Sequence, residues 1–308
     1  MFITTNITKH KLFQKFGKYY YQVLDQEIEI KRGNHLLIFK GFLYPDIDYE
    51  VADIFEHFLF NNTSFKRFKG KYSGAFINLE EDSVTIFNDQ LGLSDIFFYY
   101  KEGCLTISDK FVNIIKHIQF NKSDLDLIAL GEFLMYEHVF GNRTFIKDVK
   151  ILRYATIKKF YSKKNFIEKY HYWNYLNKEV ENFDRKSAMA HLDNLFTKSM
   201  HRIKVLNPNK EFLVGLSGGL DSRIVAKYAL NEGMEVYPFV FSNKYSDAFH
   251  ISSQISELLG LDLLKLIIKN DYWKWKNEHI DYNPMMNIMY TTYYSILEDL
   301  DINRVMLT

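Results

Sequence analysis

Apolar and polar residues alternate in short segments along the first half of the chain, up to about residue 165, and turn residues separate the segments. Alternation with a period of two predicts β-strands that each bury one face. The predicted strands are YYYQVLD, HLLIFKGFLY, GAFINLE, SVTIFND, DIFFYYKEG and LTISD. The acidic run EED joins GAFINLE to SVTIFND, so this pair of strands predicts a hairpin.

Two helices are predicted between these strands. The segment DIDYEVADIFEHFLFN opens with an aspartate suited to an N-cap and repeats apolar residues at spacings of three and four. A second helix is predicted in SDLDLIALGEFLMYE, and we expect it to open at Ser123 or Asp124. The first half is therefore predicted to be an α+β domain with mostly antiparallel strands.

The rhythm changes near residue 185, where FDRKSAMAHLDNLFTKSMHRI predicts a connecting helix with one apolar stripe. After it, continuous apolar runs alternate with helical segments, which predicts a parallel sheet covered on both faces. The expected strands are FLVGL, VYPFVF, LLKLII and RVMLT, and the expected helices are DSRIVAKYALNEG, SDAFHISSQISELLG and a segment near MMNIMYTTYYSILED. We expect two domains, 1–185 and 186–308. The stripe consists of Met189, Leu192, Leu195, Phe196, Met200 and Ile203.

Composition excludes several classes of protein. At 47% hydrophobic residues, the 308-residue chain has enough apolar side chains for a core in each half. The net charge is +1 without a basic stripe, so nucleic acid is not an expected partner. No apolar run is long enough to span a bilayer or to serve as a signal peptide, and the single Cys104 forms no internal disulfide. We expect a cytoplasmic protein without a membrane partner.

The stretch FLVGLSGGLDSRIVAKYAL, residues 212–230, breaks the apolar pattern in the second half. A glycine-rich turn between a buried strand and a helix points backbone N–H groups outward at the positive end of the helix dipole. Gly218 and Gly219 leave room for an anion at these amides, and Ser217 and Ser222 add hydroxyl donors. This arrangement suits a pyrophosphate group.

Asp221 would repel a bare anion, so its presence predicts a Mg²⁺ ion between the carboxylate and the phosphates. The alternative is a plain strand–turn–helix junction, in which Ser217 caps the helix and the glycines only turn the chain. The position at the carboxyl end of the first parallel strand favours ligand binding, because open α/β sheets bind ligands at that edge.

LSGGLDSR resembles the SGGxDS motif of the N-type ATP pyrophosphatases, which cleave ATP between the α and β phosphates. The first half resembles the class II glutamine amidotransferase domain of asparagine synthetase B. Together the two resemblances imply an α+β Ntn-hydrolase-like sandwich domain, followed by an α/β parallel-sheet PP-loop ATP pyrophosphatase domain. The matching positions in the first half are Gly70 to Phe76, Asp89 with Gly92, Phe97 to Tyr100, and Ser108 with Asp109.

The first half also departs from that family. A glutaminase of this class needs a cysteine directly after the initiator methionine, where this chain has Phe2. The oxyanion loop N-G-E-[IV]-Y-N reads KGFLYP at residues 40–45, and Asn88 replaces the arginine of R-D-x-x-G. Without nucleophile or oxyanion side chain, we expect an inactive scaffold and assign no catalytic residue. Relatives of this type, including β-lactam synthetase and lasso-peptide cyclase, form intramolecular amides without ammonia from glutamine.

The resemblance further implies that adenine packs against Leu216 and Phe241, although ordinary core packing explains such residues equally well. In the family, the strand that corresponds to RVMLT continues into a G-x-G-[GS]-D-E loop with a second Mg²⁺ carboxylate. The 308-residue sequence ends at Thr308. We therefore expect residues 1–308 alone to be inactive in ATP cleavage.

These features favour an asparagine synthetase-like ligase that uses ATP and Mg²⁺ to form amides through an acyl-adenylate. Its expected substrates are a small-molecule or peptide carboxylate and an amine, and a homodimer is possible. A second hypothesis is a non-catalytic protein that binds a nucleotide or a partner on the same fold. A third, a tRNA-modifying pyrophosphatase, is weakened by the lack of a basic surface and of cysteine pairs.

Overall fold

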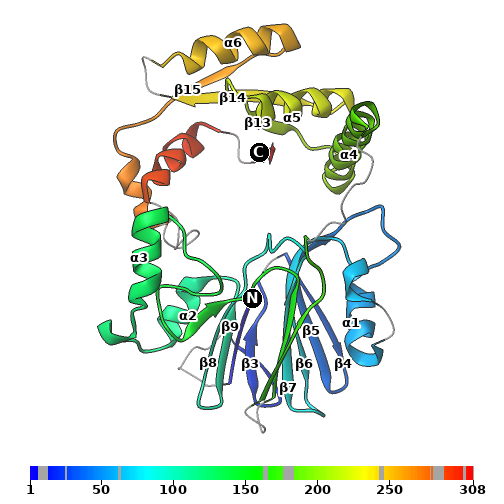
Figure 1. The fold of residues 1–308 in the computed structure, drawn as a ribbon, viewed down its shortest axis with the longest axis vertical. Coiled ribbons are helices and arrows are strands. Elements are labelled where there is room, and N and C mark those ends of the chain that lie inside the picture. The colour runs from blue at the N-terminus through cyan, green and yellow to red at the C-terminus, as the bar shows by residue number, and fades with distance from the viewer. Residues whose placement is uncertain are drawn as a thin grey trace. The chain divides into compact units, whose positions relative to one another are not determined.

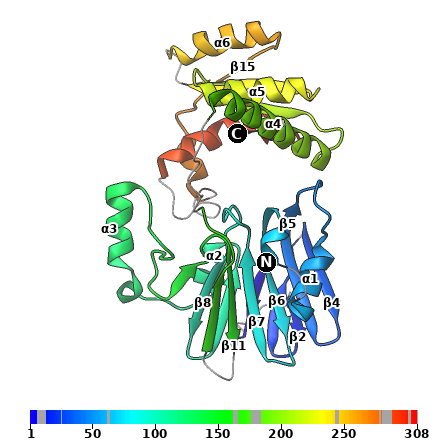
Figure 2. The ribbon, with the colours of Figure 1, turned by 45° about the vertical axis from the view of Figure 1, so that its right-hand side comes forward.

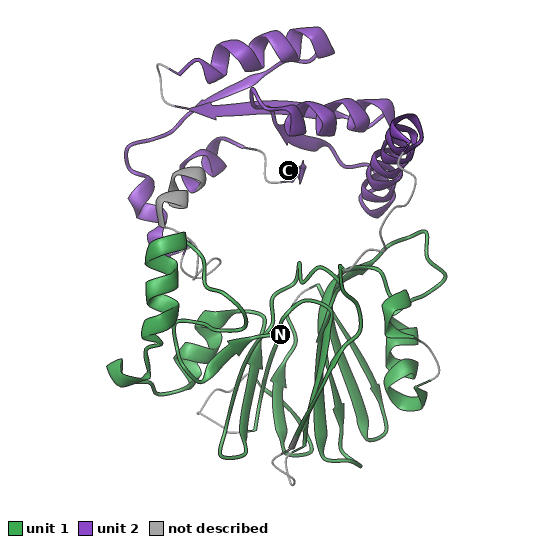
Figure 3. Cartoon of the chain, viewed as in Figure 1, with its two compact units in different colours: residues 1–176, 280–287 green, residues 177–279, 288–308 purple. Residues whose placement is uncertain are grey.

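The structure is a computed structural model that describes residues 1–5, 13–24, 26–61, 64–161, 166–175, 184–242, 246–277, 279, 288–300 and 303–307. The chain forms two compact units (Figure 3). Unit 1 comprises Met1–Leu176 and Ile280–Asn287, and unit 2 comprises Asn177–His279 and Ile288–Thr308. The division after Leu176 lies close to the boundary expected near residue 185.

Unit 1 contains two six-stranded sheets in which every pair of neighbouring strands is antiparallel (Figure 1). The first sheet has the order β10 (Val149–Ile151), β8 (Phe97–Lys101), β9 (Cys104–Ser108), β1 (Phe2–Thr4), β3 (Tyr19–Gln22), β2 (Gln14–Phe16). The second sheet has the order β12 (Phe166–His171), β11 (Thr156–Tyr161), β7 (Ser83–Asn88), β6 (Gly70–Asn78), β5 (His35–Leu43), β4 (Glu27–Arg32).

The two sheets pack face to face. Their shared core contains Ile3 and Ile107 from the first sheet and Ile38 and Ile86 from the second, all with no exposed surface. Alternate residues of the same strands point outward and require their own cover. Helices α1 (Val51–Phe60) and α2 (Phe111–His117) supply it for the second and first sheets respectively (Figure 1 and Figure 2). Unit 1 is therefore built of helix, sheet, sheet and helix layers.

The predicted hairpin is confirmed, because Asn78 of β6 pairs directly with Ser83 of β7. The first helix begins at Val51, later than the aspartates of DIDYE, because Glu50 and Asp53 form a capping box there. The second predicted helix is wrong in its start. A short 3₁₀ turn, η2 (Lys122–Asp124), precedes the separate helix α3 (Leu127–Tyr136).

The start of α3 is fixed by Asp126, which is buried and accepts hydrogen bonds from the amides of Ile128 and Ala129, both at 3.1 Å. An N-cap of this kind stabilises a helix that begins directly after it. Leu125 is extended between the two elements. The carboxylate three residues downstream of Ser123 thus decides where the helix starts. Unit 1 also contains the 3₁₀ turn η1 (Phe65–Arg67).

Unit 2 is built on a four-stranded parallel sheet, as its continuous apolar runs predict. Its order is β15 (Leu264–Ile267), β14 (Val236–Ser242), β13 (Phe212–Gly215), β16 (Val305–Leu307). The crossover helices are α5 (Leu220–Asn231) and α6 (Ala248–Leu259), and helix α4 (Arg185–Leu206) precedes the sheet. The described helices contain no segment long and apolar enough to cross a membrane.

One expectation for unit 2 is wrong in detail, and the burial of α4 is a further finding. The last predicted helix is the 3₁₀ segment η4 (Ile288–Asp299), whose β-branched and aromatic run TTYY lowers α-helix propensity; its predicted start at 285–287 lies outside the described residues. A further 3₁₀ turn is η3 (Tyr272–Trp275). The apolar stripe of α4 is buried only near its C-terminal end, where Met200 packs on the sheet. Met189 is 60% exposed and Leu192 is 53% exposed.

Candidate nucleotide-binding site

The SGGLDS segment lies where a central strand ends and a helix begins. Strand β13 ends at Gly215 and pairs with β14 on one side and β16 on the other, and α5 begins at Leu220. The loop of residues 216–219 therefore projects from the carboxyl edge of the parallel sheet. Ligands bind at this edge in open α/β sheets, because the helix N-termini converge there.

Two serines fix the shape of this loop. The Ser217 amide donates to the Ser222 hydroxyl at 3.0 Å, and the Gly219 amide donates to the Ser217 hydroxyl at 3.2 Å. The two hydroxyl oxygens lie 3.1 Å apart. Ser217 and Ser222 thus hold the turn in place, and their direct contact with a phosphate stays a prediction.

The remaining amides of the loop are available to a ligand. The first N–H groups of a helix have no intrahelical acceptor, and Gly219 at the N-cap of α5 offers no side chain to them. Residues 217–221 are all exposed. A Cβ at Gly218 would lie 3.3 Å from Ile251 Cγ2, and a Cβ at Gly219 would lie 3.3 Å from Ser217 Oγ. Glycine therefore keeps open a cradle that a larger side chain would narrow, and anion binding in this cradle stays a prediction.

Sequence reasoning missed two residues that support the loop. Arg223 donates from Nη2 to the carbonyl oxygen of Gly218 at 2.7 Å, which fixes the orientation of that peptide and places a positive charge beside the loop. The buried Ser252 of α6 donates to the carbonyl oxygen of Leu216 at 2.8 Å. Arg223 directly follows the SGGLDS motif, so its role could have been predicted from the sequence. Ser252 was not, because only the fold brings α6 to the loop.

Asp221 lies in the first turn of α5 and is exposed. Within the described residues, no group of three or more His, Cys, Asp and Glu side chains could hold a metal ion. One carboxylate fits a Mg²⁺ ion that arrives with ATP, since phosphate and water oxygens then supply its other ligands. The predicted metal role of Asp221 is compatible with its position.

Leu216 and Phe241, the residues expected to contact adenine, have side chains in different hydrophobic clusters. Leu216 is 1% exposed and packs with Val214 and Ala226, on the face of the sheet that α5 covers. Phe241 packs with Phe239 in the cluster that includes η4. The structure does not bring the two side chains together, and their adenine contact stays a prediction.

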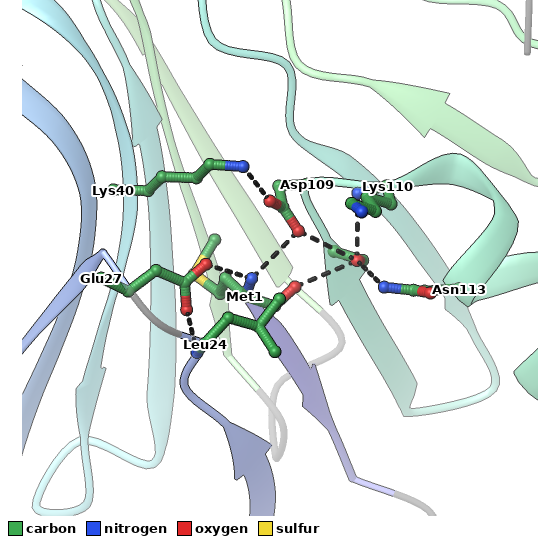
Figure 4. Close-up of polar contacts among 8 residues, drawn as sticks. Met1, Leu24, Glu27, Lys40, Asp109, Lys110 and Asn113 are labelled. Carbon is green, nitrogen blue, oxygen red and sulfur yellow. Dashed lines mark hydrogen bonds and ion pairs between the residues drawn. The ribbon is translucent and has the colours of Figure 1, made fainter. Parts of the chain in front are cut away.

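Unit 1 contains a charge cluster at the position that the amidotransferase resemblance singles out (Figure 4). The α-ammonium group of Met1 donates to Glu27 and, at 3.0 Å, to Asp109. Lys40 donates to the other oxygen of Asp109. The Glu27 and Asp109 side chains are each 2% exposed, so two buried carboxylates are neutralised by two ammonium groups.

This cluster is satisfied within itself. Burial alone would raise the pKa of the Asp109 carboxyl, but the Met1 and Lys40 ammonium groups hold that pKa below its usual value. Phe2, at the position where the amidotransferase resemblance expects a cysteine, is 6% exposed and packs its ring against His117 at 5.2 Å between centroids. Position 2 is therefore an ordinary core position in this chain.

Asp89 and Asn88, at the R-D-x-x-G position of unit 1, also have structural partners. Asp89 is fully buried and accepts hydrogen bonds from four backbone amides. The donors are Tyr72, Leu91, Leu93 and Ser94. Asn88 donates to the carbonyl oxygen of Leu152 and accepts from the amide of Thr156. These contacts hold loops together and leave neither side chain directed at a substrate.

Comparisons with known proteins give no sequence relative. No family model matches the chain, and no curated protein is similar to it in sequence. Among solved structures, an NMN synthetase from Francisella tularensis covers 41% of this chain at 20% identity with a TM-score of 0.27. An allosteric regulatory enzyme of purine biosynthesis covers 78% of this chain at 8% identity with a TM-score of 0.28.

A glutamine phosphoribosylpyrophosphate amidotransferase from B. subtilis, complexed with ADP and GMP, also covers 78% of this chain at 8% identity, with a TM-score of 0.28. This chain spans 54% of the length of the NMN synthetase, 62% of the purine-biosynthesis enzyme and 72% of the B. subtilis amidotransferase. At these TM-scores the likenesses do not assign the chain to a family.

Proposed function

We propose that this protein is an ATP-dependent ligase that forms an amide through an acyl-adenylate, on an Ntn-hydrolase-like sandwich followed by a PP-loop ATP pyrophosphatase domain. The observation that carries the proposal is the loop after β13, which offers the amides of Gly218 and the first turn of α5 at the carboxyl edge of the sheet. The exposed Asp221 beside these amides fits a Mg²⁺ ion held with the phosphates.

In the first step of the proposed reaction, an oxygen of the substrate carboxylate attacks the α-phosphorus of ATP. The bond from that phosphorus to the bridging oxygen of the β-phosphate breaks, and pyrophosphate leaves with the electron pair. The loop amides and the helix dipole of α5 stabilise the charge that builds up on the leaving pyrophosphate. Arg223 keeps the Gly218 peptide oriented during this step, through its hydrogen bond to the Gly218 carbonyl oxygen.

In the second step, an amine attacks the carbonyl carbon of the acyl-adenylate, AMP leaves, and the amine loses a proton as the amide forms. We propose that unit 1 delivers no ammonia from glutamine, because its position 2 is a buried phenylalanine and its charge cluster is internally paired. The amine is then a substrate that enters from solution. The carboxylate and the amine are small molecules or peptides.

The test is an activity assay of the full-length protein. The reaction contains Mg²⁺-ATP, one carboxylic acid from a panel, and hydroxylamine as the amine. We expect pyrophosphate, AMP and a hydroxamate in equal amounts with at least one acid, and their loss in Asp221→Asn. The exposed Asp262→Asn is the matched control and should keep full activity, because Asp262 lies after α6 and outside the loop. Equal activity in the two variants contradicts the assigned site.

A second measurement separates the ligase from the non-catalytic alternative. Mg²⁺-ATP binding that is weakened in Asp221→Asn, without pyrophosphate release for any acid, supports a nucleotide-binding protein on the same fold. Glutamate release from glutamine above the blank reaction contradicts the inactive assignment of unit 1. That result would leave the proposal for the loop after β13 standing.

A further inference from the structure

Unit 1 contains a cavity of about 500 Å³ that no step of the proposed reaction uses. It lies on the outer face of the second sheet, between the C-terminal half of α1 with η1 on one side and β6, β7, β11 and β12 on the other. A volume of this size suits a small organic molecule. The cavity is distant in sequence from the SGGLDS loop and belongs to unit 1 alone.

The strand register explains why these side chains share one face. Phe76 pairs with Thr85, Thr85 with Lys159, and Lys159 with Glu168, so the four residues form one row across β6, β7, β11 and β12. Residues that are directly opposite in antiparallel strands point to the same face of a sheet. Tyr170, two residues after Glu168, extends the same face. The floor of the cavity is thus a regular part of the sheet.

Aromatic side chains form one wall of the cavity. Phe58 of α1 lies 5.2 Å from Phe76 and 5.6 Å from Phe65 between ring centroids, and all three rings line the cavity. Tyr170, on β12 at the other end of the floor, is 62% exposed. Aromatic rings that line a cavity can pack against a flat aromatic group, and the faces of such rings attract a cation.

Polar side chains on the floor of the cavity can accept hydrogen bonds from an N–H group of a ligand. Thr85 is 4% exposed and lines the cavity, and its hydroxyl forms no hydrogen bond to any described residue. That hydroxyl oxygen can therefore accept from a ligand. The neighbouring Ser83 hydroxyl donates to Glu81 at 3.3 Å and keeps acceptor capacity on its own oxygen.

The charges that line the cavity favour a cation over an anion. They are two carboxylates, Glu81 and Glu168, and one ammonium group, Lys159. Lys159 donates to Glu81, and this hydrogen bond holds the pKa of the Glu81 carboxyl below its usual value, so the two groups offset each other. Two carboxylates and one ammonium group leave one net negative charge at the cavity, and Glu168 accepts a hydrogen bond from the Tyr161 hydroxyl at 3.2 Å.

We propose that this cavity is a binding site for a small aromatic molecule that carries one cationic nitrogen. The ring lies against Phe58, Phe65 and Phe76, and the nitrogen donates to the Thr85 hydroxyl and faces the Glu168 carboxylate. The residues that line this site all belong to unit 1, and none belongs to the nucleotide loop, so the inference does not depend on the ligase proposal.

Two probes of matched shape and opposite charge test the site. Phenethylamine is an ammonium ion at pH 7 and 3-phenylpropionate is an anion of similar size, and each is titrated into the protein by calorimetry. We expect phenethylamine to bind at least about tenfold more tightly, because the ring contacts are the same and only the charge differs. Equal affinity for the two probes, or no phenethylamine binding at millimolar concentration, overturns the proposal.

Substitutions at residues that line the cavity test whether phenethylamine binds there. Glu168→Gln should weaken phenethylamine binding about fivefold, as expected for losing one partly screened charge, and Thr85→Val should weaken it by a similar factor. Glu102→Gln, in the exposed turn after β8, is the charge-matched control and should leave the affinity unchanged. Asp221→Asn should also leave it unchanged.

The outcomes are distinguishable even where a variant is destabilised. Thermal unfolding checks that each variant is folded, and Glu168 is an exposed residue whose replacement leaves the core intact. Loss of binding in Glu168→Gln but not in Glu102→Gln supports the cavity. Equal losses in both overturn it. Failure of the ligase test with retained phenethylamine binding leaves this inference standing.

Discussion

The charge cluster at the start of β1 and the loop after β13 both carry the polar residues of a functional motif, but only one of them presents those residues to solvent. In the cluster, Asp109 is 2% exposed and is paired with two ammonium groups. In the loop, Asp221 is exposed and the amides beside it lack intrahelical acceptors. A motif residue that is fully paired within the protein stabilises the fold, whereas an exposed one at a sheet edge is available to a ligand.

The sharpest test of this comparison replaces one carboxylate from each region. Asp109→Ala should lower the free energy of unfolding by about 3 kcal/mol, because it leaves the two ammonium groups of the cluster with a single carboxylate. Asp221→Ala should change it by less than about 0.5 kcal/mol, since Asp221 is exposed. Urea unfolding followed by circular dichroism measures both. A larger loss in Asp221→Ala than in Asp109→Ala would reverse the comparison.

Gly218→Val tests whether the loop after β13 binds the phosphates of ATP. The added side chain meets Ile251 and narrows the anion cradle, so Mg²⁺-ATP affinity should fall about tenfold or more, the cost of losing charge-assisted hydrogen bonds. Gly131→Val is the control, because a Cβ at Gly131 of α3 meets no atom within 4 Å. Calorimetry with ATP measures both variants, and unchanged affinity in Gly218→Val would mean that ATP binds elsewhere.

Asp221→Asn tests whether the Asp221 carboxylate binds the Mg²⁺ ion that accompanies ATP. Wild-type affinity for ATP should rise about tenfold when Mg²⁺ is added, because the ion screens the carboxylate from the phosphates. In the variant, Mg²⁺ should make little difference, and affinity without Mg²⁺ should equal or exceed that of the wild type. Titrations with and without EDTA give the four values. The same Mg²⁺ dependence in both proteins would contradict a metal ligand at position 221.

Arg223→Gln should have a smaller effect. Losing the guanidinium frees the Gly218 carbonyl, so the loop must be ordered on binding, and we expect ATP affinity to fall about threefold to tenfold. Arg223→Lys should recover part of this loss if charge contributes as well as geometry. Arg185→Gln, at the start of α4, serves as the charge-matched control in the same titration.

The mildest effect concerns the pH dependence of unit 1. The folded-state pKa of Asp109 is below its ordinary value of 3.8, so its stabilisation is present above that pH and is lost as pH falls through the folded-state pKa. Lys40→Gln removes one of the groups that lower this pKa. Stability should then begin to fall at a higher pH than in the wild type, as measured by urea midpoints between about pH 5 and 2.

Much of the fold could be predicted because it follows from local periodicity. The β6–β7 hairpin and the parallel strands of unit 2 are set by patterns of fewer than about ten residues each. The predictions that were wrong depend on single polar contacts or on competition between helix types. Asp126 caps α3 and fixes its start, and the run TTYY, whose residue types have low α-helix propensity, lies in the 3₁₀ segment η4.

The sequence by itself determined where the SGGLDS loop lies, because the apolar run before it and the helical pattern after it set the strand and the helix that it joins. Only the tertiary structure decided which charges are paired. Glu27 and Asp109 lie far apart in the sequence and meet at Met1, and the row from Phe76 to Glu168 that lines the cavity exists only in the strand register. Burial and pairing depend on contacts between distant segments, and no local pattern encodes those contacts.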